Sequence, residues 1–125
     1  MVSMGMVVLG VADMGRAIGF WSQALGYELR EGGAGADWSS LTQAGGLGAG
    51  LGLQLSASAA ETHPRVHLDL YVADAAEQAA EIERLVSLGA ERVDWDLYPE
   101  DPDFVVLADT EGNRFCIVDT SHGHE

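Results

Sequence analysis

The chain has 125 residues, of which 47% are hydrophobic, so one compact domain with a buried core is expected. Its formal net charge of −14 excludes nucleic acid and anionic membranes as partners, because both bind clusters of lysine and arginine. A single cysteine excludes an internal disulfide. The sequence has neither a signal segment nor a long apolar run, so we expect a soluble, cytoplasmic protein.

The first half of the chain predicts one strand, one helix and three further strands. Residues 4–11 form the strand, and Asp13 is placed to cap a helix over residues 14–25 that ends at Gly26. The strands that follow are expected over residues 27–31, 37–42 and 51–55. The glycines between them do not have the spacing of a phosphate-binding loop.

The second half repeats this order after a small, polar linker, residues 56–64. A strand is expected over residues 65–72 and a helix from Asp74 to about Leu88. The remaining strands are expected over residues 93–97, 104–108 and 114–119. The tail, with His122 and His124, is expected to be disordered rather than metal-binding.

The strand predicted over residues 65–72 has two different faces. Its apolar face, suited to packing under a helix, carries Val66, Leu68, Leu70 and Val72. Its other face carries His67, Asp69 and Tyr71. Buried polar groups need partners, so three of them in a row indicate a binding face rather than ordinary core. Asp74 follows as a helix cap, with Glu77 three residues later as in a capping box.

An internal duplication relates the two halves. Residues 6–13 align without a gap with residues 67–74, and both predicted helices close on Leu-Gly. The identical pairs are Leu9/Leu70, Val11/Val72, Ala12/Ala73 and Asp13/Asp74. The chain is therefore predicted as one α+β domain of two βαβββ modules, about residues 1–57 and 65–120. The helices would cover the outer face of a curved mixed β-sheet and leave the other face to form a cleft.

With this duplicated unit, the chain resembles the vicinal oxygen chelate superfamily. That group contains glyoxalase I, extradiol dioxygenases, fosfomycin-resistance enzymes and bleomycin-resistance proteins. The motifs that carry the resemblance are Val11-Ala-Asp13, Ala17-x-x-Phe20-Trp21, Leu25-Gly26-Tyr27, His67-x-Asp69-x-x-Val72-x-Asp74, Leu88-Gly89-Ala90 and Asp109-x-x-Gly112-Asn113-Arg114-Phe115. They cover nearly the whole chain and are specific for the superfamily rather than for one reaction. The resemblance implies a small glyoxalase-like protein that pairs as a homodimer.

The resemblance also implies four positions for a metal. In metal-dependent members the ligands come from the first, fourth, fifth and eighth strands, and these positions fall on Met6, near Gln54, on His67 and on Cys116. Divalent ions of this group prefer oxygen and nitrogen donors, whereas Met6 and Cys116 offer sulfur. The expectation is therefore no metal and no cofactor.

Candidate site residues follow from the polar face and from the resemblance. His67 and Asp69 are the candidate catalytic pair, as a metal-free acid and base, with a purely structural pair as the alternative. The side chains expected to bind a ligand are His67, Asp69, Tyr71, Trp38, Gln54, Trp95, Arg114 and Cys116. Arg114 is suited either to binding an anion or to neutralising nearby acids. Cys116 is expected to be a small buried hydrophobe rather than a nucleophile.

The leading hypothesis is a glyoxalase-like protein that binds a small organic ligand in the cleft without metal. Two alternatives stay open. One is a divalent-metal-dependent lyase, isomerase or dioxygenase, as elsewhere in the superfamily. The other is a drug-sequestering resistance protein of the bleomycin-binding type, since an acidic protein suits a cationic antibiotic. Whether the chain catalyses any reaction is left open.

Overall fold

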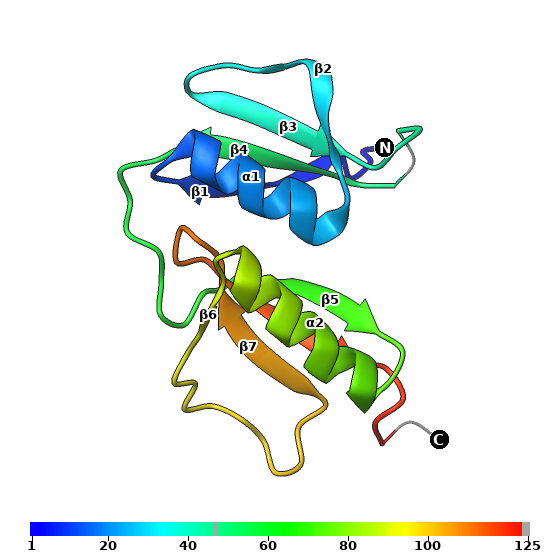
Figure 1. Cartoon of the computed structure of the whole chain (residues 1–125). Coiled ribbons are helices and arrows are strands. Elements are labelled where there is room, and N and C mark those ends of the chain that lie inside the picture. The colour runs from blue at the N-terminus through cyan, green and yellow to red at the C-terminus, as the bar shows by residue number, and fades with distance from the viewer. Residues whose placement is uncertain (47, 124–125) are drawn as a thin grey trace. The chain divides into compact units, whose positions relative to one another are not determined.

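The computed structural model describes residues 1–46 and 48–123, with the side chains of residues 31–34 left out (Figure 1). His124 of the predicted tail lies outside the described residues. The chain divides into two compact units, Met1–Ala60 (unit 1) and Glu61–Glu125 (unit 2). The boundary between them falls inside the predicted linker. Within the described ranges, neither helix has both the length and the apolar character needed to cross a membrane.

Unit 1 is a four-stranded mixed sheet with one helix against it. Its elements are β1 (Met6–Val11), α1 (Met14–Leu25), β2 (Glu28–Ala34), β3 (Trp38–Thr42) and β4 (Gly50–Leu55). The strand order is β1-β4-β3-β2, with β1 parallel to β4 and the other pairs antiparallel. The buried side of this sheet meets Ala17, Phe20 and Trp21 of α1.

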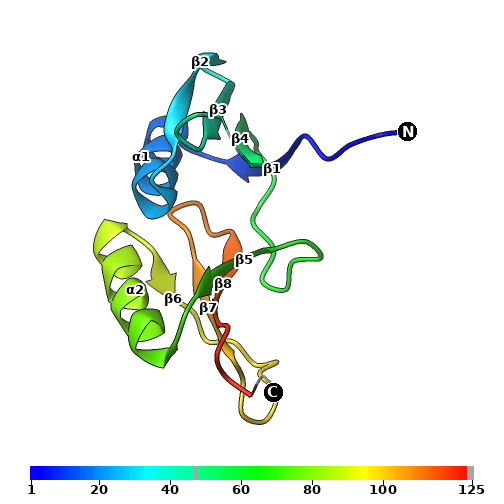
Figure 2. The same cartoon turned by 90° about the vertical axis from the view of Figure 1, so that its right-hand side faces the viewer.

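Unit 2 repeats the same topology. Its elements are β5 (Leu68–Val72), α2 (Ala75–Leu88), β6 (Glu91–Arg92), β7 (Phe104–Ala108) and β8 (Arg114–Asp119). The order is β5-β8-β7-β6, with β5 parallel to β8. Figure 2 shows the helix of each unit on one face of its own sheet. The predicted α+β class and the two βαβββ modules are confirmed, but both sheets are open rather than strongly curved.

Both helices begin and end as the sequence predicts. The Asp13 carboxylate accepts a hydrogen bond from the Arg16 backbone N–H at 3.0 Å, and α1 ends at Gly26 with φ 68°. That left-handed conformation favours glycine, which has no Cβ to clash with the backbone. In the second copy, the Asp74 carboxylate accepts from the Glu77 N–H at 2.8 Å. The duplicated aspartate is therefore a structural cap in both units.

The core of unit 2 lies between α2 and one face of its sheet. Leu107, Phe115 and Ile117 are at most 1% exposed, and Ile82 and Leu85 of α2 are buried against this sheet. Because side chains alternate along a strand, the residues between them on β8 face the opposite side. The fold thus leaves one face of this sheet free of the helix.

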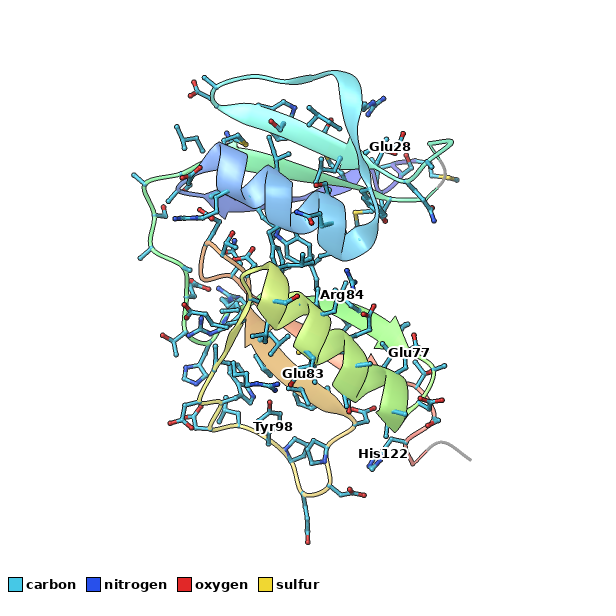
Figure 3. The ribbon with its side chains drawn as sticks, in the orientation of Figure 1. Glu28, Glu77, Glu83, Arg84, Tyr98 and His122 are labelled. Carbon is cyan, nitrogen blue, oxygen red and sulfur yellow. The ribbon has the colours of Figure 1, made fainter. Side chains whose placement is uncertain are left out.

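Two predicted boundaries in unit 2 are wrong. The strand expected over residues 93–97 is instead the two-residue β6, and the chain from residue 93 to 103 is irregular. The Tyr98 hydroxyl accepts a hydrogen bond from the Val106 N–H at 2.8 Å, so a side chain takes the place of a longer β6 ladder beside β7 (Figure 3). The strand expected from residue 65 begins only at Leu68, and Val66 is 76% exposed rather than packed under the helix.

We expect the Asp74 cap to contribute measurably to stability. Asp74→Ala removes the acceptor for the Glu77 N–H and should lower the free energy of unfolding by about 1 kcal/mol. Asp74→Asn keeps an oxygen that can accept the same bond, so it should lose much less. Urea denaturation of both variants measures the difference, and equal losses would contradict the capping role.

Candidate functional site

Unit 2 contains a cavity of about 720 Å³ on the face of its sheet opposite α2. All of its lining residues lie between His63 and Thr120, so the cavity belongs to this unit alone. Its floor is formed by alternate residues of β5, β7 and β8, and one wall comes from the irregular segment after β6. The size falls within the range of small-molecule pockets, about 300–1,000 Å³.

Strand register sets which polar groups meet in the floor. Asp69 lies opposite Cys116, and Tyr71 lies opposite Val118, in the parallel pair of β5 and β8. His67 directly precedes β5, and Arg114 is the first residue of β8. Two-residue spacing keeps each set on one face, so the side chains follow one another along the cavity.

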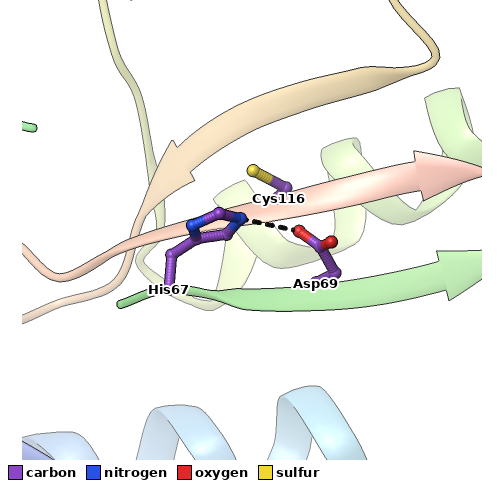
Figure 4. Close-up of side chains that lie close together, drawn as sticks. All are labelled: His67, Asp69 and Cys116. Carbon is purple, nitrogen blue, oxygen red and sulfur yellow. Dashed lines mark hydrogen bonds and ion pairs between the residues drawn. The ribbon is translucent and has the colours of Figure 1, made fainter. Parts of the chain in front are cut away.

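His67 and Asp69 form a hydrogen-bonded pair in this floor. The imidazole Nε2 and the carboxylate Oδ1 are 3.0 Å apart, and each side chain is 45% exposed (Figure 4). A carboxylate accepts hydrogen bonds, so Nε2 carries the proton in this pair. In a neutral ring Nδ1 then keeps its lone pair and can accept a proton. The pair has the composition of a general base held in one orientation by a carboxylate.

Cys116 lies beside this pair, but its thiol is a poor nucleophile. The side chain is buried, and burial raises the pKa of its thiol to about 12, with further contributions from the negative charge of Asp69 and the hydrogen bond to that carboxylate. Since the thiolate is the nucleophilic form, the thiol is unreactive at neutral pH. In this site Cys116 is therefore a protonated thiol beside the Asp69 carboxylate.

An aromatic wall closes one side of the cavity. The rings of Trp95 and His63 are 5.1 Å apart, and His63 Nε2 lies 2.6 Å from Asp96 Oδ1. This hydrogen bond lowers the pKa of the Asp96 carboxyl. The sequence alone does not identify His63, because a position in a small, polar linker predicts a surface residue. No local pattern identifies the contact, since His63 and Asp96 lie 33 positions apart.

Phe104 and Val106 also line the cavity, although neither is among the residues predicted to bind a ligand. The sequence predicts a strand over residues 104–108 that contains both. The signal was present in the alternation with Leu107, which is fully buried on the helix side. The ring of Phe104 lies 5.3 Å from that of Tyr98.

The structure gathers six of the eight predicted ligand-binding residues around this cavity. They are His67, Asp69, Tyr71, Trp95, Arg114 and Cys116. The other two, Trp38 and Gln54, belong to unit 1 and do not line the cavity of unit 2.

In unit 1 the corresponding sheet face carries Met6, Val8 and Trp38 beside the polar Ser40 and Gln54. Val8 pairs with Gly52 as Asp69 pairs with Cys116, so Gly52 rather than Gln54 occupies the position that matches Cys116. A Cβ at Gly52 would lie 2.7 Å from Trp38 Cη2, 3.0 Å from Met6 Sδ and 3.1 Å from Val8 Cγ2. Glycine at this position therefore makes room for the indole, and no polar side chain takes its place.

The family described as a glyoxalase-like domain matches residues 6–118. The chain belongs to the glyoxalase-like domain family. No curated protein matches its sequence. The likeness to solved structures covers the whole domain at low sequence identity, so these comparisons establish the fold and leave the ligand open.

Three solved structures illustrate the likeness of this glyoxalase-like domain to known folds. A protein from Agrobacterium tumefaciens has a TM-score of 0.76 and 17% identity, covering 95% of this chain and 98% of that one. A glyoxalase/bleomycin resistance protein/dioxygenase family enzyme from Burkholderia phytofirmans has a TM-score of 0.74 and 15% identity, covering 94% and 98%. A FosX fosfomycin resistance protein from Listeria monocytogenes, complexed with Mn(II) and a dihydroxypropylphosphonic acid, has a TM-score of 0.69 and 14% identity, covering 94% and 90%.

The raised pKa of Cys116 predicts slow alkylation of the folded glyoxalase-like domain. At pH about 8, the thiolate fraction should be roughly a thousandfold lower than in the unfolded chain, where the thiol has an ordinary pKa of about 8.5. Asp69→Asn removes a negative charge that raises this pKa, so the folded variant should react faster with iodoacetamide. Glu83→Gln, on the exposed side of α2, is the control and should change nothing.

Mass spectrometry of the single cysteine follows this reaction directly. Equal alkylation rates for the folded and unfolded chains would contradict the protonated thiol.

The raised pKa of the Cys116 thiol also predicts that the free energy of unfolding falls as the pH rises from about 8.5 towards about 12, because the unfolded thiol loses its proton first.

Proposed function

We propose that the cavity of unit 2 binds a small organic molecule without a resident metal, and that His67 and Asp69 contact it. The observation that carries this proposal is the cavity of about 720 Å³ with this hydrogen-bonded pair in its floor. Pockets of this size with a few polar groups among apolar side chains are typical of ligand sites. Family membership supports the proposal at the level of the fold.

The polar pair supplies the chemistry of the proposed site. His67 Nδ1 is the free basic atom when Nε2 donates to Asp69, and the carboxylate stabilises the imidazolium that forms when Nδ1 takes a proton. This arrangement suits a ligand with a hydroxyl or an acidic C–H directed at His67. Binding is the primary proposal, and proton transfer is the reaction that these residues would support.

We propose a metal-free site because of the side chains that could act as metal ligands. The nearest set of possible ligands is His67, Asp69 and Cys116, whose donor atoms lie within 4.8 Å of one another. Two of these atoms already bond to each other, and the third is a protonated thiol. In unit 1, the positions implied by the superfamily hold the thioether of Met6 and the bare Gly52. Of the four positions implied by the superfamily, only His67 and Cys116 then offer a common metal ligand, which is fewer than a stable divalent site needs.

Two broader expectations from the sequence remain proposals. A homodimer and a cytoplasmic location stay predictions. A metal-dependent reaction and the sequestration of a drug are the alternatives that the experiments below would promote if the proposal fails.

Ligand binding should depend on both members of the polar pair. A ligand found by thermal-shift screening of small organic acids, amides and amines should bind about tenfold more weakly to His67→Ala and to Asp69→Asn, because each variant removes a polar contact. His122→Ala is the matched control, since His122 forms a similar pair with Asp101, at 3.1 Å, outside the cavity. Calorimetry measures the affinities. Unchanged affinity in both cavity variants would place the ligand elsewhere.

The purified, untagged protein should carry no stoichiometric divalent metal after dialysis without chelator. The reason is the poor donor set, which would have to displace the hydration shell of the ion. Elemental analysis makes the measurement. About one equivalent of zinc, iron, nickel or manganese, lost on Asp69→Asn, would overturn the metal-free proposal and assign the ion to His67, Asp69 and Cys116.

A further inference from the structure

Arg114 is a cation in the cavity floor whose hydrogen bonds are incomplete. Its Nη1 donates to the Gly112 carbonyl at 3.0 Å, whereas its Nε is buried and has no hydrogen-bond partner. Buried donors without a partner are rare in folded proteins, and each one calls for an explanation. Arg114 lines a cavity of the size of a small ligand. An acceptor on that ligand would supply the hydrogen-bond partner that Nε lacks.

Arg114 has no carboxylate partner in the described part of the chain, although the sequence is rich in acidic residues. The sequence has 20 Asp and Glu against 6 Lys and Arg, so carboxylates are plentiful. Arg84 and Arg92 both pair with glutamates. Among the side chains that the structure describes, Arg114 forms no ion pair with a carboxylate. Asp69, on the adjacent strand, forms its hydrogen bond with His67 instead.

We infer that the cavity binds a small monocarboxylate, with the carboxylate on Arg114 and an apolar remainder over Val106, Val118 and Phe104. This inference rests on the proposed function and narrows it to a class of ligand. Because Nη1 is held by Gly112 and Nε has no partner, the unsatisfied edge of the guanidinium is the one formed by Nε and Nη2. That edge matches the two oxygens of a planar carboxylate in a bidentate pair. Water does not reach Nε in this conformation, so the side chain turns slightly as the second oxygen binds.

The order of side chains along the strands gives the ligand its direction. Arg114 and His67 lie at one end of the floor, Asp69 and Cys116 follow, and Val118 lies beyond them opposite Phe104. The far end also holds the Asp103 carboxylate. Two acidic side chains beyond the arginine would repel a second anionic group on the ligand. The cavity therefore favours a monoanion whose body is neutral and apolar over a dianion.

Three probes of one shape test the charge requirement on the full chain. They are hydrocinnamate, its amide and phenylpropylamine, which carry a negative, a neutral and a positive head on the same phenyl tail. Calorimetry should show the acid binding at least about tenfold more tightly than the amide, and the amine most weakly. Arg114→Gln should reduce the affinity for the acid to that for the amide and leave the amide unchanged. Arg114→Lys keeps the positive charge but lacks the planar guanidinium, so its affinity for the acid should lie between those of the natural chain and Arg114→Gln.

The control variant is Arg84→Gln on α2, which removes an arginine of a surface ion pair and should leave all three affinities unchanged (Figure 3). Binding of the amide or the amine as tightly as the acid would overturn the carboxylate assignment and leave the small-molecule site intact. Failure of all three probes at millimolar concentration would overturn the class of ligand, whereas the screen with His67→Ala and Asp69→Asn tests the site itself. If Arg114→Gln does not fold, the comparison of acid with amide on the natural chain still decides.

Discussion

β5 and β8 run parallel with Leu68 opposite Phe115 and Asp69 opposite Cys116, and the chemistry of unit 2 depends on this register. A slip of one residue would turn Phe115 and Ile117 into the cavity and bury Arg114 under the helix. The core prevents such a slip, because both apolar side chains are about 1% exposed beneath α2. Packing on one face of the sheet thus holds the polar groups in place on the other face.

The two halves of the duplication share a scaffold but differ in this exposed chemistry. Both keep the aspartate cap and the parallel pair of strands. Where unit 2 places Asp69 opposite Cys116, unit 1 places Val8 opposite Gly52, and Trp38 lies over the glycine. Residues that form the scaffold are therefore repeated, whereas residues on the free face are not. This difference explains why the His67–Asp69 pair of unit 2 has no counterpart at the matching positions, Met6 and Val8, of unit 1.

Periodicity and repetition in the sequence were sufficient to predict the helices and most of the strands. The helix Met14–Leu25 and the last two strands have the predicted bounds, because hydrophobic spacing and helix caps are local signals. The path of the chain after β6 could not be predicted, because two tertiary contacts determine it. Tyr98 accepts a hydrogen bond from the Val106 N–H, and the ring of Trp95 lies against that of His63. Such contacts join distant positions and leave no periodic trace. His67 and Asp69 could be predicted because side chains alternate along a strand, which is a local signal. The unpaired Nε of Arg114 could not, because it depends on the tertiary surroundings.

The protonated state of Cys116 has a consequence for the durability of the protein. Peroxide attacks thiolates and converts them to sulfenic and then to sulfinic acid, so a thiol that seldom ionises is oxidised slowly. A sulfinate here would put a second permanent negative charge beside Asp69 on a buried strand, and the fold would lose stability. By holding the proton on the sulfur, Asp69 and the surrounding apolar strand shield the only cysteine of the chain from irreversible oxidative damage.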